Sequence, residues 1–301
     1  MKVILLENIW KSFGKSFTLQ NINLRVQRGE IFGYLGPNGA GKTTTIRIIA
    51  TLLRPDRGYA EVEGIPVLEM PEKVREVVGV LPENVGLYEN LTGEENLLFF
   101  ARVYNLSEKD ARERIREYLE FFGLWDRKDD YVGKYSKGMK KRLALARAML
   151  HSPKVLLLDE PTAGLSPEVA LEVEHLIIEL AKKEKVTIFL STHNLDVAER
   201  LCNRVGVILN GRLVSIMNVN KVTTFSEVII KLADNVESFA AFLDDWSYEI
   251  NEDKIIVRTR NYEEDVPRII SILVQKGARI LEVYPKRETL RDMYMRIVRG
   301  G

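Results

Sequence analysis

The sequence is poor in several features that would assign it to particular classes of protein. It contains one cysteine, Cys202, so no disulfide can form within the chain and folding needs no oxidising compartment. It has no excess of charge of one sign, because 44 Lys and Arg residues stand against 43 Asp and Glu residues. This balance excludes the globally basic kind of protein that coats nucleic acid. The longer apolar runs, such as residues 155–158, are too short to cross a bilayer.

The sequence does contain enough apolar residues to form folded cores. Hydrophobic residues make up 46% of the 301 residues and charged residues 29%, which is typical of globular domains and not of disordered chains. A chain of this length favours two domains. Its strand-like and helical patterns divide it into residues 1–218 and residues 225–301, with a polar segment at 218–224 between them.

A glycine-rich segment at residues 36–43 follows a predicted strand at 30–35 and precedes a predicted helix at 44–53. It fits the pattern G-x-x-x-x-G-K-[ST] in the strand–loop–helix context of a phosphate-binding loop. Glycines let successive backbone N–H groups turn toward phosphate oxygens, and the helix N-terminus adds a positive dipole end. The segment therefore predicts binding of ATP or GTP; a plain glycine-rich turn is the alternative. The candidate nucleotide-binding residues are Gly36, Pro37, Asn38, Gly39, Ala40, Gly41, Lys42, Thr43 and Thr44.

Polar residues follow two strands that are predicted to be buried. Asp159 and Glu160 come directly after the strand at 155–158, and His193 comes shortly after the strand at 186–190. The carboxyl ends of parallel strands form the ligand-binding edge of an α/β sheet. Strand alternation would point the two carboxylates in different directions, so that Asp159 reaches Mg²⁺ and Glu160 orients or deprotonates the attacking water. His193 is a candidate γ-phosphate contact. A strand that ends in polar residues and a structural histidine are the alternatives.

Helices are predicted between these strands from their capping residues. Thr92 and Glu95 form a capping box ahead of residues 96–104, because each side chain can bond the other's backbone N–H. Ser107 is a candidate N-cap of the next helix, and Ser136 begins a third helix that runs through 140–150. Later in the chain, the dipeptide Asn210-Gly211 predicts a β-hairpin.

These motifs, in this order, resemble those of the ATP-binding subunits of ATP-binding cassette (ABC) transporters, over residues 1 to about 218. Residues 36–43 match the family's Walker A motif, and residues 158–162 match the end of its Walker B motif. Residues 135–139, Tyr-Ser-Lys-Gly-Met, resemble its signature, and His193 matches its switch histidine. Phe13 stands where the family places an aromatic side chain that stacks on adenine; an ordinary core or edge aromatic is the alternative. The resemblance implies an α/β P-loop ATPase fold with a β-subdomain and a helical subdomain, and the cofactors ATP and Mg²⁺.

The resemblance also implies a dimer in which two such domains pack head to tail. Each ATP would lie between the Walker A motif of one protomer and the signature of the other, so that Ser136 and Gly138 bind the nucleotide of the partner domain. A helix N-terminus such as that at Ser136 attracts phosphate, although the residue can also serve as a plain N-cap. The catalytic residues that the resemblance implies are Glu160, His193 and Lys42. The Mg²⁺ ligands that it implies are Thr43, Asp159 and Glu83.

The sequence departs from the family pattern at four positions. Glu83 replaces a glutamine that usually contacts Mg²⁺ or water, and a carboxylate can still coordinate the ion. Lys137 and Met139 replace a glycine and a glutamine of the signature, and Lys137 adds a charge that attracts phosphate. Ser166 replaces an aspartate in a loop that couples the two ATP sites. The catalytic positions are retained, so we still expect hydrolysis.

Residues 225–301 predict a small α+β domain. Alternating apolar residues, amphipathic stretches and a glycine stop at Gly277 give the order β-α-β-β-α-β-α, which suggests a ferredoxin-like unit. The predicted elements are residues 226–232, 236–246, 248–250, 254–259, 263–276, 278–284 and 287–298. The block has fewer basic than acidic residues and no RNP-like run, so we expect no nucleic-acid partner. It resembles the accessory domain of exporter-type ABC subunits, for which a dimerisation or regulatory role is expected.

The sequence therefore predicts an ATP-hydrolysing subunit that powers transport, in the direction of export, through a separate transmembrane permease. It would act as a homodimer or as a heterodimer with a related subunit, held peripherally at the cytoplasmic face of the membrane. A soluble ABC ATPase acting on nucleic acid or ribosomes is the alternative. A P-loop kinase or GTPase is a third possibility, against which the signature and His193 argue.

Overall fold

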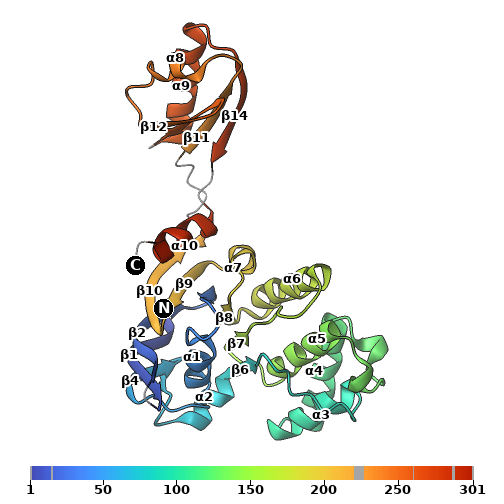
Figure 1. Cartoon of the computed structure of the whole chain (residues 1–301). Helices are drawn as coiled ribbons and strands as arrows, with labels where there is room; N and C mark the ends of the chain where they lie inside the picture. Colours follow the sequence, from blue (N-terminus) through green and yellow to red (C-terminus); the bar gives the residue numbers. More distant parts are fainter. Residues whose placement is uncertain (1, 15, 220–226, 260, 287–288, 300–301) are drawn as a thin grey trace. The chain divides into compact units, whose positions relative to one another are not determined.

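A computed structural model of the chain describes residues 2–14, 16–219, 227–259, 261–286 and 289–299. The chain divides into two compact units, Met1–Met217 and Asn218–Gly301, which are drawn in Figure 1. The domain start expected at residue 225 and most of the expected linker, from residue 220 onward, lie outside the described residues.

One sheet of the first unit is antiparallel and has the strand order β2-β1-β4-β5. Its strands are β1 (Lys2–Phe13), β2 (Ser16–Gln27), β4 (Arg57–Val62) and β5 (Ile65–Pro66). The short strand expected at residues 3–6 is only the start of β1, which continues to Phe13 because it pairs with β2 along its length. Alternate side chains such as Ile4, Leu6 and Ile22 are fully buried in the core that this sheet shares with the second one.

The second sheet has six strands in the order β10-β9-β3-β8-β7-β6. They are β3 (Ile31–Leu35), β6 (Val78–Leu81), β7 (Val155–Asp159), β8 (Thr187–Thr192), β9 (Arg204–Leu209) and β10 (Arg212–Asn218). The pairings of β6 with β7, β7 with β8, β8 with β3 and β3 with β9 are parallel. Every residue of β3, β7 and β8 is buried, as continuous apolar runs predict for strands covered on both faces. The carboxyl ends of these central strands therefore meet at one edge.

Four helices of the first unit flank the sheets: α1 (Lys42–Ile49), α2 (Pro71–Val77), α6 (Pro167–Glu184) and α7 (Leu195–Leu201). Helix α1 contacts strands of both sheets, and its Ile46 and Ile49 belong to the shared core. The helix expected at 44–53 thus begins two residues earlier and ends at Ile49, because Thr51 takes a left-handed conformation with φ 63°. The predicted hairpin is present between β9 and β10, with positive φ at Asn210 and Gly211.

Three further helices pack together beside the β6 edge of the large sheet (Figure 1). They are α3 (Gly93–Val103), α4 (Glu108–Phe121) and α5 (Lys137–Met149), with short 3₁₀ helices at Trp125–Arg127 and Val132–Lys134. The predicted caps are confirmed: Thr92 and Glu95 form both bonds of a capping box. Ser107 caps α4, and the Ser136 Oγ accepts a hydrogen bond from the backbone N–H of Met139 at 3.2 Å.

The second unit is a four-stranded antiparallel sheet with helices. Its elements are β11 (Glu227–Leu232), α8 (Val236–Ala240), β12 (Tyr248–Asn251), β13 (Lys254–Arg258), α9 (Tyr262–Gln275), β14 (Ile280–Lys286) and α10 (Leu290–Arg299). The strand order is β12-β13-β11-β14, and each pairing is antiparallel. The succession of elements β11 to β14 is that of a split βαβ unit. One face of β11 and β13 supplies Val228, Ile230 and Ile255 to the core of this unit.

Most elements of this unit agree with the predicted bounds within one residue, and two differ by more. The helix expected at 236–246 ends at Ala240, because Phe242, Leu243 and Trp246 then bond carbonyls three residues back and form turns. The strand expected at 278–284 begins at Ile280. The expected starts at residues 226 and 287 lie outside the described residues. Within the part of the chain that the structure describes, no helix is both long enough and apolar enough to span a bilayer.

Candidate active site

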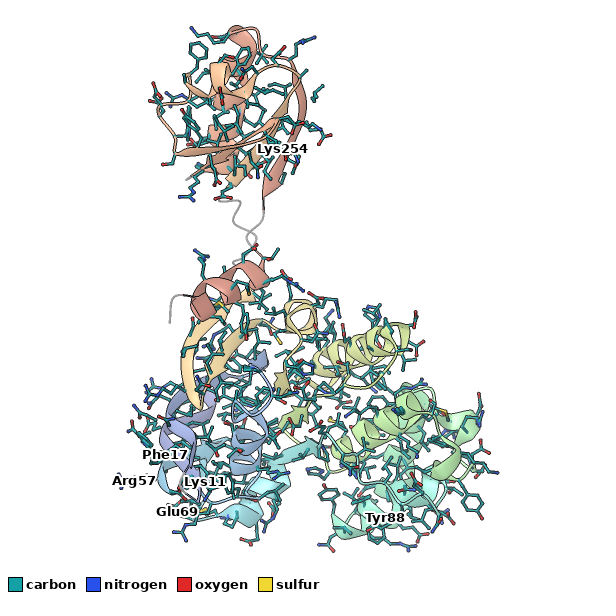
Figure 2. The ribbon with its side chains drawn as sticks, viewed as in Figure 1. Lys11, Phe17, Arg57, Glu69, Tyr88 and Lys254 are labelled. Atoms are coloured by element: carbon teal, nitrogen blue, oxygen red, sulfur yellow. The ribbon has the colours of Figure 1, made fainter. Side chains whose placement is uncertain are left out.

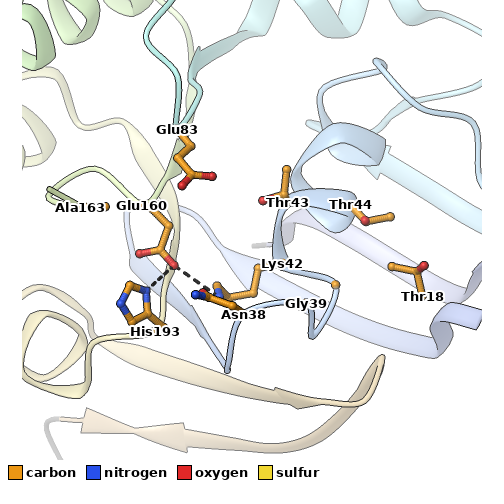
Figure 3. Close-up of a pocket in the computed structure, with 11 residues that line it drawn as sticks. Thr18, Asn38, Gly39, Lys42, Thr43, Thr44, Glu83, Glu160, Ala163 and His193 are labelled. Atoms are coloured by element: carbon orange, nitrogen blue, oxygen red, sulfur yellow. Dashed lines mark hydrogen bonds and ion pairs between the residues drawn. The ribbon is translucent and has the colours of Figure 1, made fainter.

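A cavity of about 310 Å³ lies at the edge where β3, β7 and β8 end (Figure 3). It is lined by nine residues that the sequence singled out, namely Asn38, Gly39, Gly41, Lys42, Thr43, Thr44, Glu83, Glu160 and His193. Thr18 and Ala163 also line it and were not predicted, because neither belongs to a recognisable motif. Residues from five separate segments of the first unit therefore converge on one hollow.

The loop between β3 and α1 requires glycine at Gly41. Its φ is 109°, and a Cβ there would lie 2.8 Å from the carbonyl oxygen of Thr18, so any other residue is both strained and obstructed. Gly36, Pro37 and Ala40 do not line the cavity. The carbonyl oxygens of Gly36 and Pro37 instead accept hydrogen bonds from the Lys42 Nζ at 2.9 and 3.2 Å. The loop thus curls around the amine of the lysine at the start of α1.

The Lys42 side chain is buried, with 6% of its surface exposed, and faces a carboxylate. Its Nζ lies 3.3 Å from Oε1 of Glu160. The Nδ1 of His193 lies 3.0 Å from the same oxygen, and the His193 side chain is half-exposed (52%). Figure 3 shows the Glu160 carboxylate between the Lys42 amine and the His193 ring. One carboxylate oxygen therefore contacts both residues that the sequence proposed as phosphate contacts.

The sequence pattern predicted that strand alternation directs the Glu160 side chain into the site, and this prediction is wrong. Strand β7 ends at Asp159, and Glu160 has a left-handed backbone with φ 48°. Its backbone N–H donates to the carbonyl oxygen of Ser191 at 3.2 Å and to the Ser191 Oγ at 3.3 Å. A non-glycine residue in this region is strained, and here the bonds to β8 hold it. The left-handed turn, and not the pleat, directs the Glu160 carboxylate into the cavity.

Asp159 lies behind the cavity surface and is 3% exposed. Its Oδ1 accepts a hydrogen bond of 2.5 Å from the Ser191 Oγ. Ser191 is fully buried because β8 runs to Thr192, two residues beyond the predicted end at 190. One signal in the sequence could have identified Ser191, namely its place between a buried strand and His193.

The oxygen groups at this edge suit a small hard cation. Thr43 offers a hydroxyl and Glu83 a carboxylate at the cavity wall, and Asp159 adds a second carboxylate close behind. Among the described residues, no three His, Cys, Asp or Glu side chains form a cluster that could hold a metal by themselves. Mg²⁺ is commonly held by one or two carboxylates together with substrate phosphates and waters. The donor set therefore fits Mg²⁺ that arrives with a nucleotide.

The signature residues lie away from this cavity. Ser136 is exposed and caps α5, while Gly138 is buried. A Cβ at Gly138 would overlap with Cγ1 of Val169 in α6, so the glycine is needed for the packing of α5 on α6. The packing against Val169 by itself explains why a glycine stands at position 138.

The aromatic side chains near the β1–β2 turn are exposed. Phe13 is 54% exposed, with the Lys11 Nζ 5.6 Å from its ring centre. Phe17 is 58% exposed and packs edge to face on Trp10; Figure 2 labels Lys11 and Phe17. Neither phenylalanine lines the cavity, and stacking of Phe13 on adenine stays a prediction.

Comparison with known proteins gives a consistent result. Residues 19–163 match the protein family described as ABC transporter. The chain is 34% identical over 304 residues to the bacitracin transport ATP-binding protein BcrA of Bacillus licheniformis, covering 99% of this chain and 98% of that protein. It is 41% identical over 208 residues to the Nod factor export ATP-binding protein I of Burkholderia lata, covering 69% of this chain and 68% of that protein. The dimeric post-hydrolysis structure of the ATP-binding cassette MJ0796 with ADP and Pi matches with a TM-score of 0.65 and 27% identity. The match covers 72% of this chain and 98% of that chain.

Proposed function

This chain belongs to the ABC transporter family of ATP-binding proteins, and on that premise we propose that it powers export of a substrate through a separate membrane permease. The predicted α/β P-loop ATPase fold and the predicted role in ATP-driven transport are confirmed by its relatives. Relatives named for bacitracin transport, daunorubicin resistance and Nod factor export support the direction of export. We assign residues 1–218 to the ATP-binding domain and residues 225–301 to an accessory domain.

The contact of Glu160 Oε1 with both Lys42 and His193 carries the catalytic assignment. If a γ-phosphate entered the cavity, its oxygens would replace the Glu160 carboxylate as partners of Lys42 and His193, because each of these residues can bind a phosphate oxygen. Glu160 would then be the carboxylate nearest to a water attacking the phosphorus, and would orient that water or accept its proton. Lys42 and His193 would stabilise the charge that develops on the transferred group.

We assign Thr43, Asp159 and Glu83 to the Mg²⁺ that accompanies ATP. When bound, the ion would supply positive charge that offsets the charge of the phosphates. The loop at Asn38, Gly39 and Gly41 would bind the phosphates through backbone N–H groups. Phe13 would stack on the adenine, as the family resemblance implies.

We further propose that two copies, or this chain and a related subunit, enclose ATP between them. Ser136 and Gly138 belong to a helix start that does not line the cavity of its own chain. The first turn of α5 contains no acidic residue, and Lys137 is exposed there, so this end attracts an anion. The dimeric MJ0796 structure, bound to ADP and Pi, supports this arrangement.

An exposed aromatic cluster in the helical subdomain is our candidate for the permease-binding surface. Tyr88, Phe99 and Val103 are 47%, 41% and 59% exposed. Tyr88 packs edge to face on Phe99 with ring centres 4.9 Å apart, and Phe100 lies against both; Figure 2 labels Tyr88. Contiguous exposed apolar groups mark protein or membrane contact. Binding there would hold the chain peripherally at the cytoplasmic face of the membrane.

The test is co-purification from membranes of the organism that encodes the chain. The bait is Glu160→Gln with Mg-ATP, because a variant that binds ATP without hydrolysing it should stay assembled. We expect a polytopic membrane protein to co-purify, and Phe99→Ser in the same bait to reduce its recovery. The matched control is Phe242→Ser in the second unit, where the ring is 43% exposed, and it should not change recovery. Recovery of ribosomes or nucleic acid in place of a membrane protein would contradict the proposal.

A further inference from the structure

Helix α5 holds the segment that follows β6 through two buried cations. The Lys141 Nζ donates to the carbonyl oxygen of Glu83 at 3.2 Å, and the Arg147 Nη1 donates to the carbonyl oxygen of Gly86 at 2.9 Å. Lys141 and Arg147 are only 5% and 8% exposed. The helix that begins at Ser136 is therefore bonded at two buried points to the segment that carries Glu83.

Burying an ammonium group is costly unless anions lie close to it. Burial lowers the pKa of Lys141, and the charges of Glu83, Asp159 and Glu160 act against part of this lowering. These are the carboxylates that line or back the active-site cavity. Lys141 thus acts on these carboxylates through its charge, while its hydrogen bond goes to the Glu83 backbone.

Glu83 is also the residue at which the sequence departs from the family's glutamine. A carboxylate in place of an amide adds one negative charge to the cavity that Glu160 also lines. Like charges around one cavity repel one another unless cations lie near them. Lys141 supplies such a cation from a neighbouring element, without occupying the cavity itself.

We propose that Lys141 is a positioning residue for the metal side of the active site, fixing the Glu83 backbone and offsetting the charge of the Glu83 carboxylate. The proposal rests on the assignment of Glu83 to the Mg²⁺ site. Lys141 and Ser136 share helix α5, so Lys141 connects the helix that begins at the signature to the Glu83 segment.

The first test compares Lys141→Met with Lys140→Met in the full chain. Lys140 is next along α5 and pairs at the surface with Glu89 at 2.6 Å, so it controls for loss of a lysine. We expect Lys141→Met to speed hydrogen exchange of the bonded amides on either side of the Glu83 segment by about tenfold, namely those of β6 and that of Tyr88, which donates to the Asn96 Oδ1 at 2.9 Å. Lys140→Met should leave these amides unchanged, and Lys141→Arg should restore them. Unchanged exchange in Lys141→Met would overturn the positioning part of the proposal.

The second test measures how binding of a fluorescent ATP analogue depends on Mg²⁺ concentration, which requires no turnover. Removing a positive charge that acts on Glu83, Asp159 and Glu160 favours binding of Mg²⁺, so Lys141→Met should lower the half-saturating Mg²⁺ by about threefold. Adding Glu83→Gln to this variant removes one negative charge and should return the value to that of the original protein. A Mg²⁺ dependence that Lys141→Met leaves unaltered would overturn the charge-offset part.

A third variant guards against misfolding of Lys141→Met. Lys141→Gln keeps a donor for the Glu83 carbonyl but carries no charge, so it should shift the Mg²⁺ dependence while exchange stays near that of the original protein. The opposite pattern, fast exchange with an unshifted Mg²⁺ dependence, would overturn the proposal. Failure of the original protein to bind nucleotide with Mg²⁺ would instead contradict the proposed function.

Discussion

Ser191 on β8 bonds Asp159 at the end of β7, with 2.5 Å between the Ser191 Oγ and the Asp159 Oδ1. The same hydroxyl oxygen accepts a hydrogen bond from the backbone N–H of Glu160 at 3.3 Å. One buried hydroxyl therefore fixes a candidate metal ligand and the candidate catalytic carboxylate residue at once. The positions of Asp159 and Glu160 therefore depend on β8 as well as on β7.

Ser191→Ala should lower both stability and turnover. The Asp159 carboxylate would lose a buried donor, which costs about 1–3 kcal/mol, and ATP hydrolysis should fall by about tenfold because both acidic residues lose a support. The control is Thr187→Val, at the other end of the same strand, where the hydroxyl accepts from the backbone of Gly29 at 3.0 Å. It should cost similar stability, seen in thermal unfolding, and leave turnover unchanged. Equal losses of turnover in the two variants would contradict the positioning role.

Glu160→Gln should bind ATP and hydrolyse it slowly. Replacing the carboxylate removes the group that orients or deprotonates water, which lowers turnover by about 100-fold or more. It also removes an anion beside Lys42, so nucleotide binding should be kept or strengthened. Phosphate release and binding of a fluorescent ATP analogue measure the two effects. The matched control is Glu168→Gln, because Glu168 is exposed in the first turn of α6. Normal turnover in Glu160→Gln would contradict the catalytic assignment.

His193→Ala should reduce turnover by about 100-fold, because it removes one donor to charge that develops on the phosphoryl group. The chain offers a matched control in His175, an exposed histidine on α6, whose replacement by alanine should have no effect. Steady-state ATP hydrolysis by the two variants is the measurement. A His193→Ala variant as active as His175→Ala would show that the contact with Glu160 is structural.

Gly138→Ala separates the packing role of this glycine from its expected role at a phosphate. The added methyl group would clash with the side chain of Val169, and such overpacking costs about 1–3 kcal/mol. Adding Val169→Ala relieves the clash and should restore the thermal midpoint. If Gly138 also approaches a partner's nucleotide, ATP turnover should stay low in the double variant. Full recovery of turnover would leave Gly138 with a packing role alone.

His151 should make stability depend on pH. Burial lowers the pKa of its imidazole below the ordinary 6.5, while its Nε2 contacts the carbonyl oxygen of Val78 at 3.0 Å and its ring stacks on Tyr104. The unfolded chain then binds more protons below pH 6.5, so stability present above that pH is lost as the pH falls through the folded pKa. His151→Phe keeps a ring on Tyr104, and its thermal midpoint should fall less between pH 7 and 5. His175→Phe should behave like the original protein, and equal slopes for all three would contradict the prediction.

Features that are encoded within a few neighbouring residues could be predicted without the structure. The phosphate-binding loop, the cap at Thr92 and the hairpin at Asn210-Gly211 each depend on local backbone preferences. The apolar run before Asp159 predicted a buried parallel strand for the same reason. These signals placed most of the residues of the cavity at one sheet edge and identified the family.

How those residues meet depends on contacts between distant parts of the chain. The direction of Glu160 comes from a left-handed backbone held by Ser191, and the need for glycine at Gly138 comes from Val169 on another helix. Lys141 contacts Glu83 across 58 positions of sequence, a separation over which no periodicity or cap carries information. Hydrogen bonds and close packing depend on distance in space, and chain neighbours alone do not fix that distance.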